Sequence, residues 1–193
     1  GSKYVQSCIG NIYKDVEYFV KNKRRVLFTG TPCQVAGLKK FLHKEYENLL
    51  TVDILCHGVP SPRVFRNYLT YIGKGKKIVN FDFRDKSTGW KGYSVKYVYE
   101  NGKIKRHSAR LDEYMRAYLN HYMLRPSCHV CPAKAGKSGS DITLGDLWGA
   151  NQLPMIKDDD TGLSVVIVNT EKGEKNLNLP MPVSYTHLRA HET

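Results

Sequence analysis

The feature that most constrains this fold is a strand followed by a helix, a pattern that occurs twice in succession. An apolar run at residues 26–28 predicts a short buried strand, and Thr-Gly-Thr-Pro-Cys-Gln follows at residues 29–34. In that turn Thr31 can cap a helix, Pro32 suits the first helical position, and Gln34 completes a capping box. A strand that leads directly into a helix is typical of a parallel sheet.

The second strand-helix unit repeats this outline. A strand is predicted over residues 50–55, the turn Cys-His-Gly-Val-Pro follows at residues 56–60, and Ser61 and Pro62 start a helix. A helical pattern at residues 9–20 precedes the first unit. The N-terminal side therefore predicts parallel strand-helix units.

The middle of the chain changes to a strand pattern. Strands are predicted over residues 78–83, 93–99 and 103–107, and Asn101-Gly102 is a strong hairpin signal between the last two. A third helix is predicted over residues 111–123, which Pro126 stops. A cysteine loop and strands over 141–144 and 164–169 follow. The predicted fold class is mixed α/β, with an antiparallel hairpin in the middle and a cysteine loop near the C-terminal side.

The two ends of the chain differ from its interior. The segment 182–193 matches one reading frame of a sequencing adapter, and the chain opens at Gly1 without an initiator Met. We therefore predict one domain over residues 1–181, incomplete at both ends, and a non-native tail.

The net charge of +12 comes from basic residues spread along the whole chain. They fall mostly at predicted helix ends and hairpin edges, where solvated charge is the ordinary expectation, so we expect no nucleic-acid partner. An anionic cofactor or an acidic partner would use the same charge. No apolar run is long enough to cross a bilayer and no secretory signal is present, so we expect a cytoplasmic protein without a membrane span.

Four of the five cysteines have an informative spacing. Cys128 and Cys131 form a C-x-x-C pair followed by Pro132, while Cys33 and Cys56 each come just after a predicted strand. The carboxyl ends of parallel strands are where open α/β folds place their ligands. Four thiolates could therefore meet at this edge around one metal centre.

Several interpretations of these cysteines remain open. An iron–sulfur cluster and a zinc ion both take four thiolates, and Cys33 and Cys56 could instead be small buried apolar residues. One close pair joined to two isolated cysteines favours a cluster over zinc. Cys33 could also be a nucleophile at a helix N-terminus with His57 as its base, and Cys8 is interpreted as incidental.

Three further segments could hold a cofactor. The turn at 29–34 brings a glycine and a helix N-terminus together, which suits a phosphate, although the dinucleotide and P-loop fingerprints are absent. Residues 140–149 place an acid, an aromatic and glycines at a strand end, where they could line a flat cofactor or leave Trp148 as a core residue. Residues 83–86 with Trp90 could hold an anion or be a solvated strand end.

Taken together and in order, six sequence blocks resemble the C-terminal domain of the coenzyme F420 hydrogenase/dehydrogenase beta-subunit family. The resemblance covers about residues 1–175. The blocks are Gly-Ser-Lys-Tyr-Val-Gln-Ser at 1–7, the turns at 29–34 and 56–62, Phe-Arg-Asp-Lys at 83–86, Ser-Cys-His-Val-Cys at 127–131, and Ser-Asp-Ile-Thr-Leu-Gly-Asp-Leu-Trp-Gly at 140–149.

The resemblance implies an FAD-containing oxidoreductase subunit that exchanges a hydride with coenzyme F420 or a similar carrier and single electrons with 4Fe–4S clusters. By motif match, the implied cluster ligands are Cys33, Cys56, Cys128 and Cys131. The implied flavin contacts are Ser2, Lys3, Tyr4, Thr29, Gly30, Thr31, Pro32, Gln34, Asp146, Trp148 and Gly149.

The resemblance also indicates partners. Many relatives carry a ferredoxin-like segment with repeated C-x-x-C-x-x-C runs, which this sequence does not contain. We therefore expect electrons to pass through such a segment or a partner redox subunit, and through a small-molecule carrier. The alternative is a zinc-stapled, non-redox binding or assembly module linked to surface-polysaccharide biosynthesis.

Overall fold

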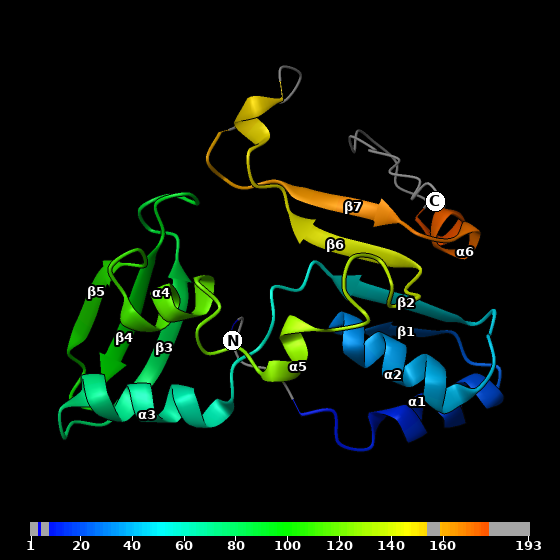
Figure 1. Ribbon diagram of the computed structural model, residues 1–193, viewed down its shortest axis with the longest axis horizontal. Coiled ribbons are helices and arrows are strands. Elements are labelled where there is room, and N and C mark those ends of the chain that lie inside the picture. The colour runs from blue at the N-terminus through cyan, green and yellow to red at the C-terminus, as the bar shows by residue number, and fades with distance from the viewer. Residues whose placement is uncertain (1–3, 5–7, 154–158, 178–193) are drawn as a thin grey trace. The chain divides into compact units, whose positions relative to one another are not determined.

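The computed structural model describes Tyr4, residues 8–153 and residues 159–177 (Figure 1). These residues divide into two compact units. Unit 1 contains Tyr4, Cys8 and residues 57–130 and 159–162; unit 2 contains residues 9–56, 131–153 and 163–177. The predicted non-native tail lies outside the described residues.

Unit 2 is built on a four-stranded sheet with the order β1-β2-β6-β7. Its strands are β1 (Val26–Thr29), β2 (Leu49–Ile54), β6 (Ile142–Asp146) and β7 (Ser164–Val168). The pairs β1–β2 and β2–β6 are parallel, as the strand-helix pattern predicts, and β7 pairs antiparallel with β6.

Two helices pack on the β1–β2 part of this sheet (Figure 1). They are α1 (Ile12–Lys21) and α2 (Pro32–Leu42), and they follow the predicted helical patterns. A short helix, α6 (Glu171–Asn176), follows β7, and η1 (Ala150–Gln152) follows β6. The buried core is aliphatic except for one ring: Val16, Val20, Phe28, Val35, Leu38, Leu42 and Leu49.

Unit 1 is built on a three-stranded antiparallel sheet with the order β3-β4-β5. The strands are β3 (Ile78–Asp85), β4 (Ser94–Tyr99) and β5 (Ile104–Ser108), and the helices are α3 (Pro62–Gly73), α4 (Glu113–Leu119) and α5 (Pro126–His129). The predicted hairpin is present, with Gly102 at φ +79°. The core of unit 1 is mainly aromatic: Phe83, Val95, Tyr97, Tyr99, Ala109, Tyr114 and Met115.

The third predicted helix is the main difference from the sequence-based expectation. It is shorter than predicted, because α4 ends at Leu119 and the chain then turns. Tyr122, which the helical pattern places on the apolar face, is 84% exposed. Pro126 does not stop a helix; it begins α5, where a missing amide costs nothing at the first helical position. Cys128 therefore lies on a short helix rather than on a loop.

None of the helices in the described part of the chain has the length and hydrophobicity of a membrane-spanning segment.

Candidate functional site

The turn after β1 has the local structure that its sequence predicts. Thr31 is the N-cap of α2, Pro32 is its first residue, and the Oε1 atom of Gln34 accepts the Thr31 amide at 2.9 Å. The Gly30 amide donates to the carbonyl of Val52 at 3.1 Å, which ties this turn to β2. The turn is thus fixed by strand pairing on one side and by a cap on the other.

Cys33 lies in the first turn of α2 and is exposed. Its Sγ atom is 3.2 Å from the Thr31 hydroxyl. Burial, followed by the nearby charge of Cys33, raises the pKa of the Tyr13 hydroxyl above its ordinary value. Because the side chain is exposed, Cys33 suits ligation better than it suits an apolar core.

The other predicted ligand cysteines are half-buried, and none of the cysteines in the described chain forms a disulfide. The interpretation of Cys33 and Cys56 as buried small apolar residues does not fit these exposures. Cys33, Cys56 and Cys131 belong to unit 2, and Cys128 belongs to unit 1. Within the part of the chain that the structure describes, no three His, Cys, Asp or Glu side chains form a group able to hold a metal ion.

The turn after Cys56 packs against α4 and the segment that follows it in unit 1. His57 Nε2 lies 3.1 Å from the carbonyl of Tyr118, and the Tyr118 hydroxyl donates to the carbonyl of Gly58 at 3.0 Å. Gly58 has φ +136°, and a Cβ there would lie 2.8 Å from Leu124 and 3.3 Å from the Cβ of Cys128. Glycine is therefore required for this close approach.

Tyr4 is the one described member of the predicted N-terminal flavin segment, because Ser2 and Lys3 lie outside the described residues. Its ring packs edge-on against Phe83 and Tyr118, with centroids 5.1 and 5.0 Å away. Burial raises the pKa of its hydroxyl far above the ordinary value. Tyr4 therefore stays neutral and packs against the aromatic core of unit 1.

The segment after β6 presents an aromatic side chain to solvent. Trp148 is 57% exposed, so it is not a core residue. The Leu147 amide donates to the Leu163 carbonyl at 2.8 Å, and Gly149 has φ +84°, a left-handed conformation that suits glycine. An exposed indole beside a glycine gives a flat ligand both a stacking surface and room for approach.

Arg84 is buried, so the interpretation of residues 83–86 as a solvated strand end does not fit it. It is 8% exposed and lies over two aromatic faces, 4.5 Å from the Tyr93 ring and 5.3 Å from the Trp90 ring. Cation–π contact with two rings stabilises the buried guanidinium.

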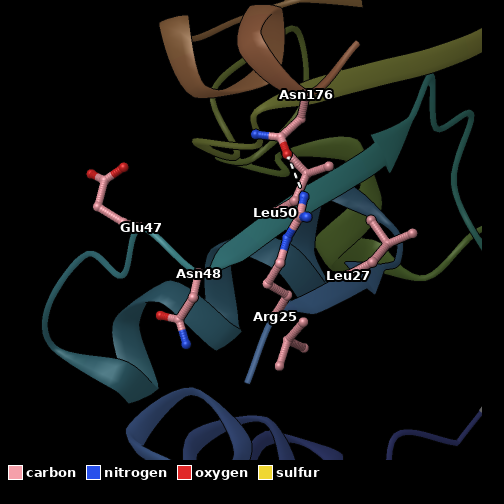
Figure 2. A pocket seen from close by; sticks show the side chains of 7 residues that line it. Arg25, Leu27, Glu47, Asn48, Leu50 and Asn176 are labelled. Atoms are coloured by element: carbon pink, nitrogen blue, oxygen red, sulfur yellow. Dashed lines mark hydrogen bonds between the residues drawn. The ribbon is translucent and has the colours of Figure 1, made fainter. Parts of the chain in front are cut away.

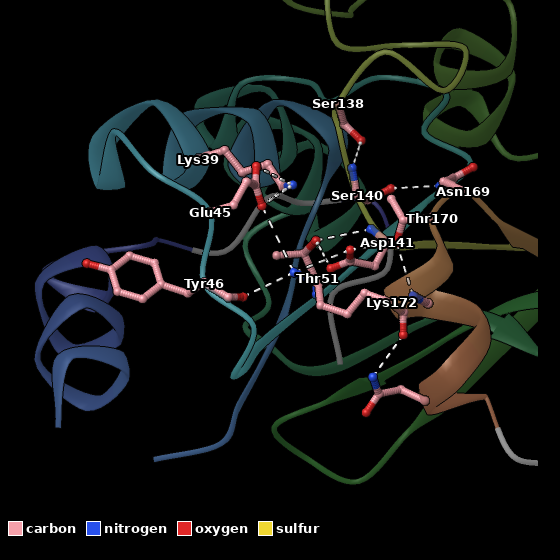
Figure 3. A network of polar contacts seen from close by, with 12 residues as sticks. Lys39, Glu45, Tyr46, Thr51, Ser138, Ser140, Asp141, Asn169, Thr170 and Lys172 are labelled. Carbon is pink, nitrogen blue, oxygen red and sulfur yellow. Dashed lines mark hydrogen bonds and ion pairs between the residues drawn. The ribbon is translucent and has the colours of Figure 1, made fainter. Parts of the chain in front are cut away.

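A buried polar network in unit 2 was not predicted from the sequence (Figure 3). Asp141, 1% exposed, accepts the amide and hydroxyl of Thr51 at 2.8 and 2.7 Å and the Thr170 hydroxyl at 2.8 Å. Lys172 approaches it at 3.6 Å. Burial alone would raise the pKa of Asp141, but these hydrogen bonds and the lysine charge hold it below its ordinary value.

A second buried carboxylate, Asp53, lies on β2 and accepts the hydroxyls of Ser138 and Thr143 at 2.6 and 2.5 Å. The signal that could have found it is an acidic residue inside an otherwise apolar strand, because unpaired carboxylates are almost never fully buried. Its partners were not predictable, since they are distant in sequence.

A pocket of about 190 Å³ opens beside β1 and α6 (Figure 2). Arg25 donates to the side-chain oxygen of Asn176 at 3.3 Å across it. None of the predicted site residues lines this pocket; its lining is Arg25, Val26, Leu27, Glu47, Asn48, Leu50 and Asn176.

Comparison with known families decides the classification. The model of the family described as the C terminus of the coenzyme F420 hydrogenase/dehydrogenase beta subunit matches residues 23–191. The chain belongs to this family. The match covers five of the six sequence blocks that carry the resemblance and begins after the block at residues 1–7. This F420 beta-subunit family is named for hydrogenases and dehydrogenases, which are oxidoreductases.

A solved structure shares the fold of this F420 beta-subunit family member. It belongs to the F420-reducing NiFe hydrogenase complex from Methanosarcina barkeri and is 18% identical, with a TM-score of 0.50. The similarity covers 91% of the present chain and 54% of that chain, so the present chain spans about half of its length. No curated protein matches the chain.

Proposed function

We propose that this chain is part of an FAD- and iron–sulfur-dependent electron-transfer oxidoreductase subunit. A bound flavin would exchange a hydride with coenzyme F420 or a similar carrier and single electrons with 4Fe–4S clusters, because flavins couple two-electron and one-electron chemistry. Membership of the F420 hydrogenase/dehydrogenase beta-subunit family supports the proposal.

The observation that carries the metal part of the proposal is the accessibility of the thiols. Cys33 is exposed at a helix N-terminus, and Cys56, Cys128 and Cys131 are half-buried. Thiolates are the ligands that iron–sulfur clusters and structural zinc both use, so the chemistry of the donors fits the proposed cluster, although the described side chains do not converge as a group of three. These four cysteines would hold it, with Cys33 placed at the N-terminus of α2.

The flavin part of the proposal rests on the turn after β1 and on the exposed segment after β6. The turn presents the N-terminus of α2, whose amides favour a phosphate group. Trp148 offers a face for a ring system, and Gly149 lets the ligand approach the backbone. The residues proposed to contact flavin are Ser2, Lys3, Tyr4, Thr29, Gly30, Thr31, Pro32, Gln34, Asp146, Trp148 and Gly149.

The proposal includes a cellular setting. Thiolate ligands persist in a reducing compartment, so the protein would act in the cytoplasm. Electrons would leave or enter through a ferredoxin-like segment or a partner redox subunit.

Single Cys→Ser substitutions test the ligand set, with Cys8→Ser as the matched control because Cys8 is also exposed. Each of the four ligand substitutions is expected to lower the iron bound per chain after anaerobic purification, and Cys8→Ser is expected to leave it unchanged. Full iron content in all four variants would contradict the ligand assignment, and zinc in place of iron would favour the binding-module alternative.

A further inference from the structure

The loop that carries Cys131 is fastened to strand β2 by one buried carboxylate. Ser138, seven residues after Cys131, donates its hydroxyl to Asp53 at 2.6 Å. The same Ser138 oxygen accepts the amide of Ser140 at 3.0 Å. Ser138 is 4% exposed, so this contact is closed to solvent. One side chain of β2 thus fixes both a side chain and the backbone of the cysteine loop.

The second carboxylate oxygen of Asp53 is held as firmly as the first. It accepts the hydroxyl of Thr143, on β6, at 2.5 Å. Both distances are in the range of charge-assisted O–H···O⁻ hydrogen bonds, which are about twice as strong as neutral ones. Asp53 is 2% exposed and takes part in none of the ion pairs found among the described residues. A carboxylate is costly to bury without a cation, so these bonds compensate a large desolvation penalty.

Asp53 lies on β2 close to segments that carry proposed ligand cysteines. Asp53 comes three residues before Cys56, which follows the end of β2 at Ile54. The neighbouring residue Val52 accepts the Gly30 amide, which begins the turn that carries Cys33. Two consecutive residues of β2 therefore contact the segments that carry Cys33 and Cys131, and the same strand leads to Cys56, all within unit 2.

We propose that Asp53 is a positioning residue for the thiolate site, holding the Cys131 loop in register with the strand end that carries Cys56. The metal part of this inference rests on the proposed function. Asp53 acts through Ser138 and not by ligation.

The test compares three variants with a control from the same buried network. Asp53→Asn keeps the shape of the side chain but removes the charge, Ser138→Ala removes one hydroxyl, and Ser138→Thr retains it. Thr170→Val is the control, because Thr170 contacts Asp141 and caps α6 but does not touch the cysteine loop. Iron affinity is measured by competition with a chelator, and thermal stability is measured in parallel.

Asp53→Asn and Ser138→Ala are expected to weaken iron binding about 10–100-fold, the usual effect of removing a group that orients a metal ligand. Ser138→Thr is expected to restore most of the affinity. Thr170→Val is expected to lower the melting temperature without this loss of affinity. Equal iron affinity in Asp53→Asn and wild type, or an equal loss in Thr170→Val, would overturn the proposal.

A second measurement needs no metal and separates this proposal from the proposed function. In chelator-treated protein, iodoacetamide labelling of Cys131 is expected to accelerate severalfold in Asp53→Asn and Ser138→Ala, because the loop opens, while labelling of exposed Cys8 stays constant. Unchanged labelling of Cys131 would overturn the positioning role. If the wild-type chain binds no iron, while Cys131 is labelled faster in Asp53→Asn and Ser138→Ala than in wild type, the proposed function is contradicted and the positioning role is supported.

Discussion

The two units of this chain are stabilised in different ways. Unit 1 has a core of interlocking rings, in which Phe83 contacts Tyr4, Phe65, Phe81 and Tyr114 with centroids 4.6 to 5.5 Å apart. Unit 2 has an aliphatic core on one part of its sheet and, beside it, two buried carboxylates held mainly by hydroxyl groups. Three of the four proposed ligand cysteines belong to unit 2.

This difference indicates which of the two units constrains the positions of its side chains more strictly. Apolar packing tolerates small shifts, whereas a buried carboxylate loses most of its stabilisation when a donor moves. Unit 2 therefore combines three proposed ligand cysteines with a buried polar network, in which Asp53 contacts the loop that follows Cys131. In unit 1, packed aromatic rings stabilise the sheet and contact Tyr4.

The largest effect is expected from truncating the two cores. Leu38 in unit 2 and Met115 in unit 1 are both fully buried, and Leu38→Ala and Met115→Ala should each lower the free energy of unfolding by about 2–5 kcal/mol. Denaturant unfolding followed by circular dichroism measures this cost. A cost below about 1 kcal/mol for either would show that its unit relaxes around the cavity, contrary to close packing.

A smaller effect, specific to unit 2, is expected in acid. The pKa of Asp141 is lower in the folded state than in the unfolded state, where it is about 4. The stabilisation that Asp141 contributes is therefore fully present above the unfolded-state pKa and is lost as the pH falls through the folded-state pKa. Thr51→Val removes one hydroxyl donor and should flatten this part of the pH dependence while lowering stability at neutral pH by about 1–3 kcal/mol.

Urea unfolding between about pH 7 and pH 3 measures this dependence for Asp141. Thr70→Val is the control, because the Thr70 hydroxyl bonds only to the backbone of its own exposed helix face. If Thr51→Val and wild type lose stability in parallel as the pH falls, Asp141 is not the group responsible.

The smallest effect on stability is expected from Trp148→Ala. Trp148 is 57% exposed, so its loss should change the free energy of unfolding by no more than about 0.5 kcal/mol. Flavin binding, measured by fluorescence quenching, should nevertheless weaken. Tyr122→Ala, at an 84% exposed aromatic in unit 1, should affect neither quantity. Unchanged flavin affinity in Trp148→Ala would remove this residue from the proposed site.

Local signals in the sequence predicted much of the fold. The capping box at Thr31 and Gln34, the prolines that start α2 and α3, and the hairpin at Gly102 all act through neighbouring residues, and the structure has each of them. The error at Pro126 has the opposite cause. A proline stops one helix and starts another equally well, and only tertiary packing decides between them.

The candidate site was less predictable for the same physical reason. The cysteines were visible as a pattern, but Asp53 and Asp141 find their partners about 90 residues away, across β2 and β6. Such pairs depend on the register of parallel strands, and no local spacing encodes that register. The exposure of Trp148 was likewise open in the sequence, because an aromatic at a strand end suits both a core and a binding surface.

The central claim, that this chain holds both an iron–sulfur cluster and a flavin, is tested most directly by anaerobic purification followed by visible absorption and quantitation of iron, zinc and flavin. The account predicts a yellow-brown protein that contains iron and flavin together. A colourless protein, with zinc or with neither metal nor flavin, would contradict the redox function and leave only the family fold.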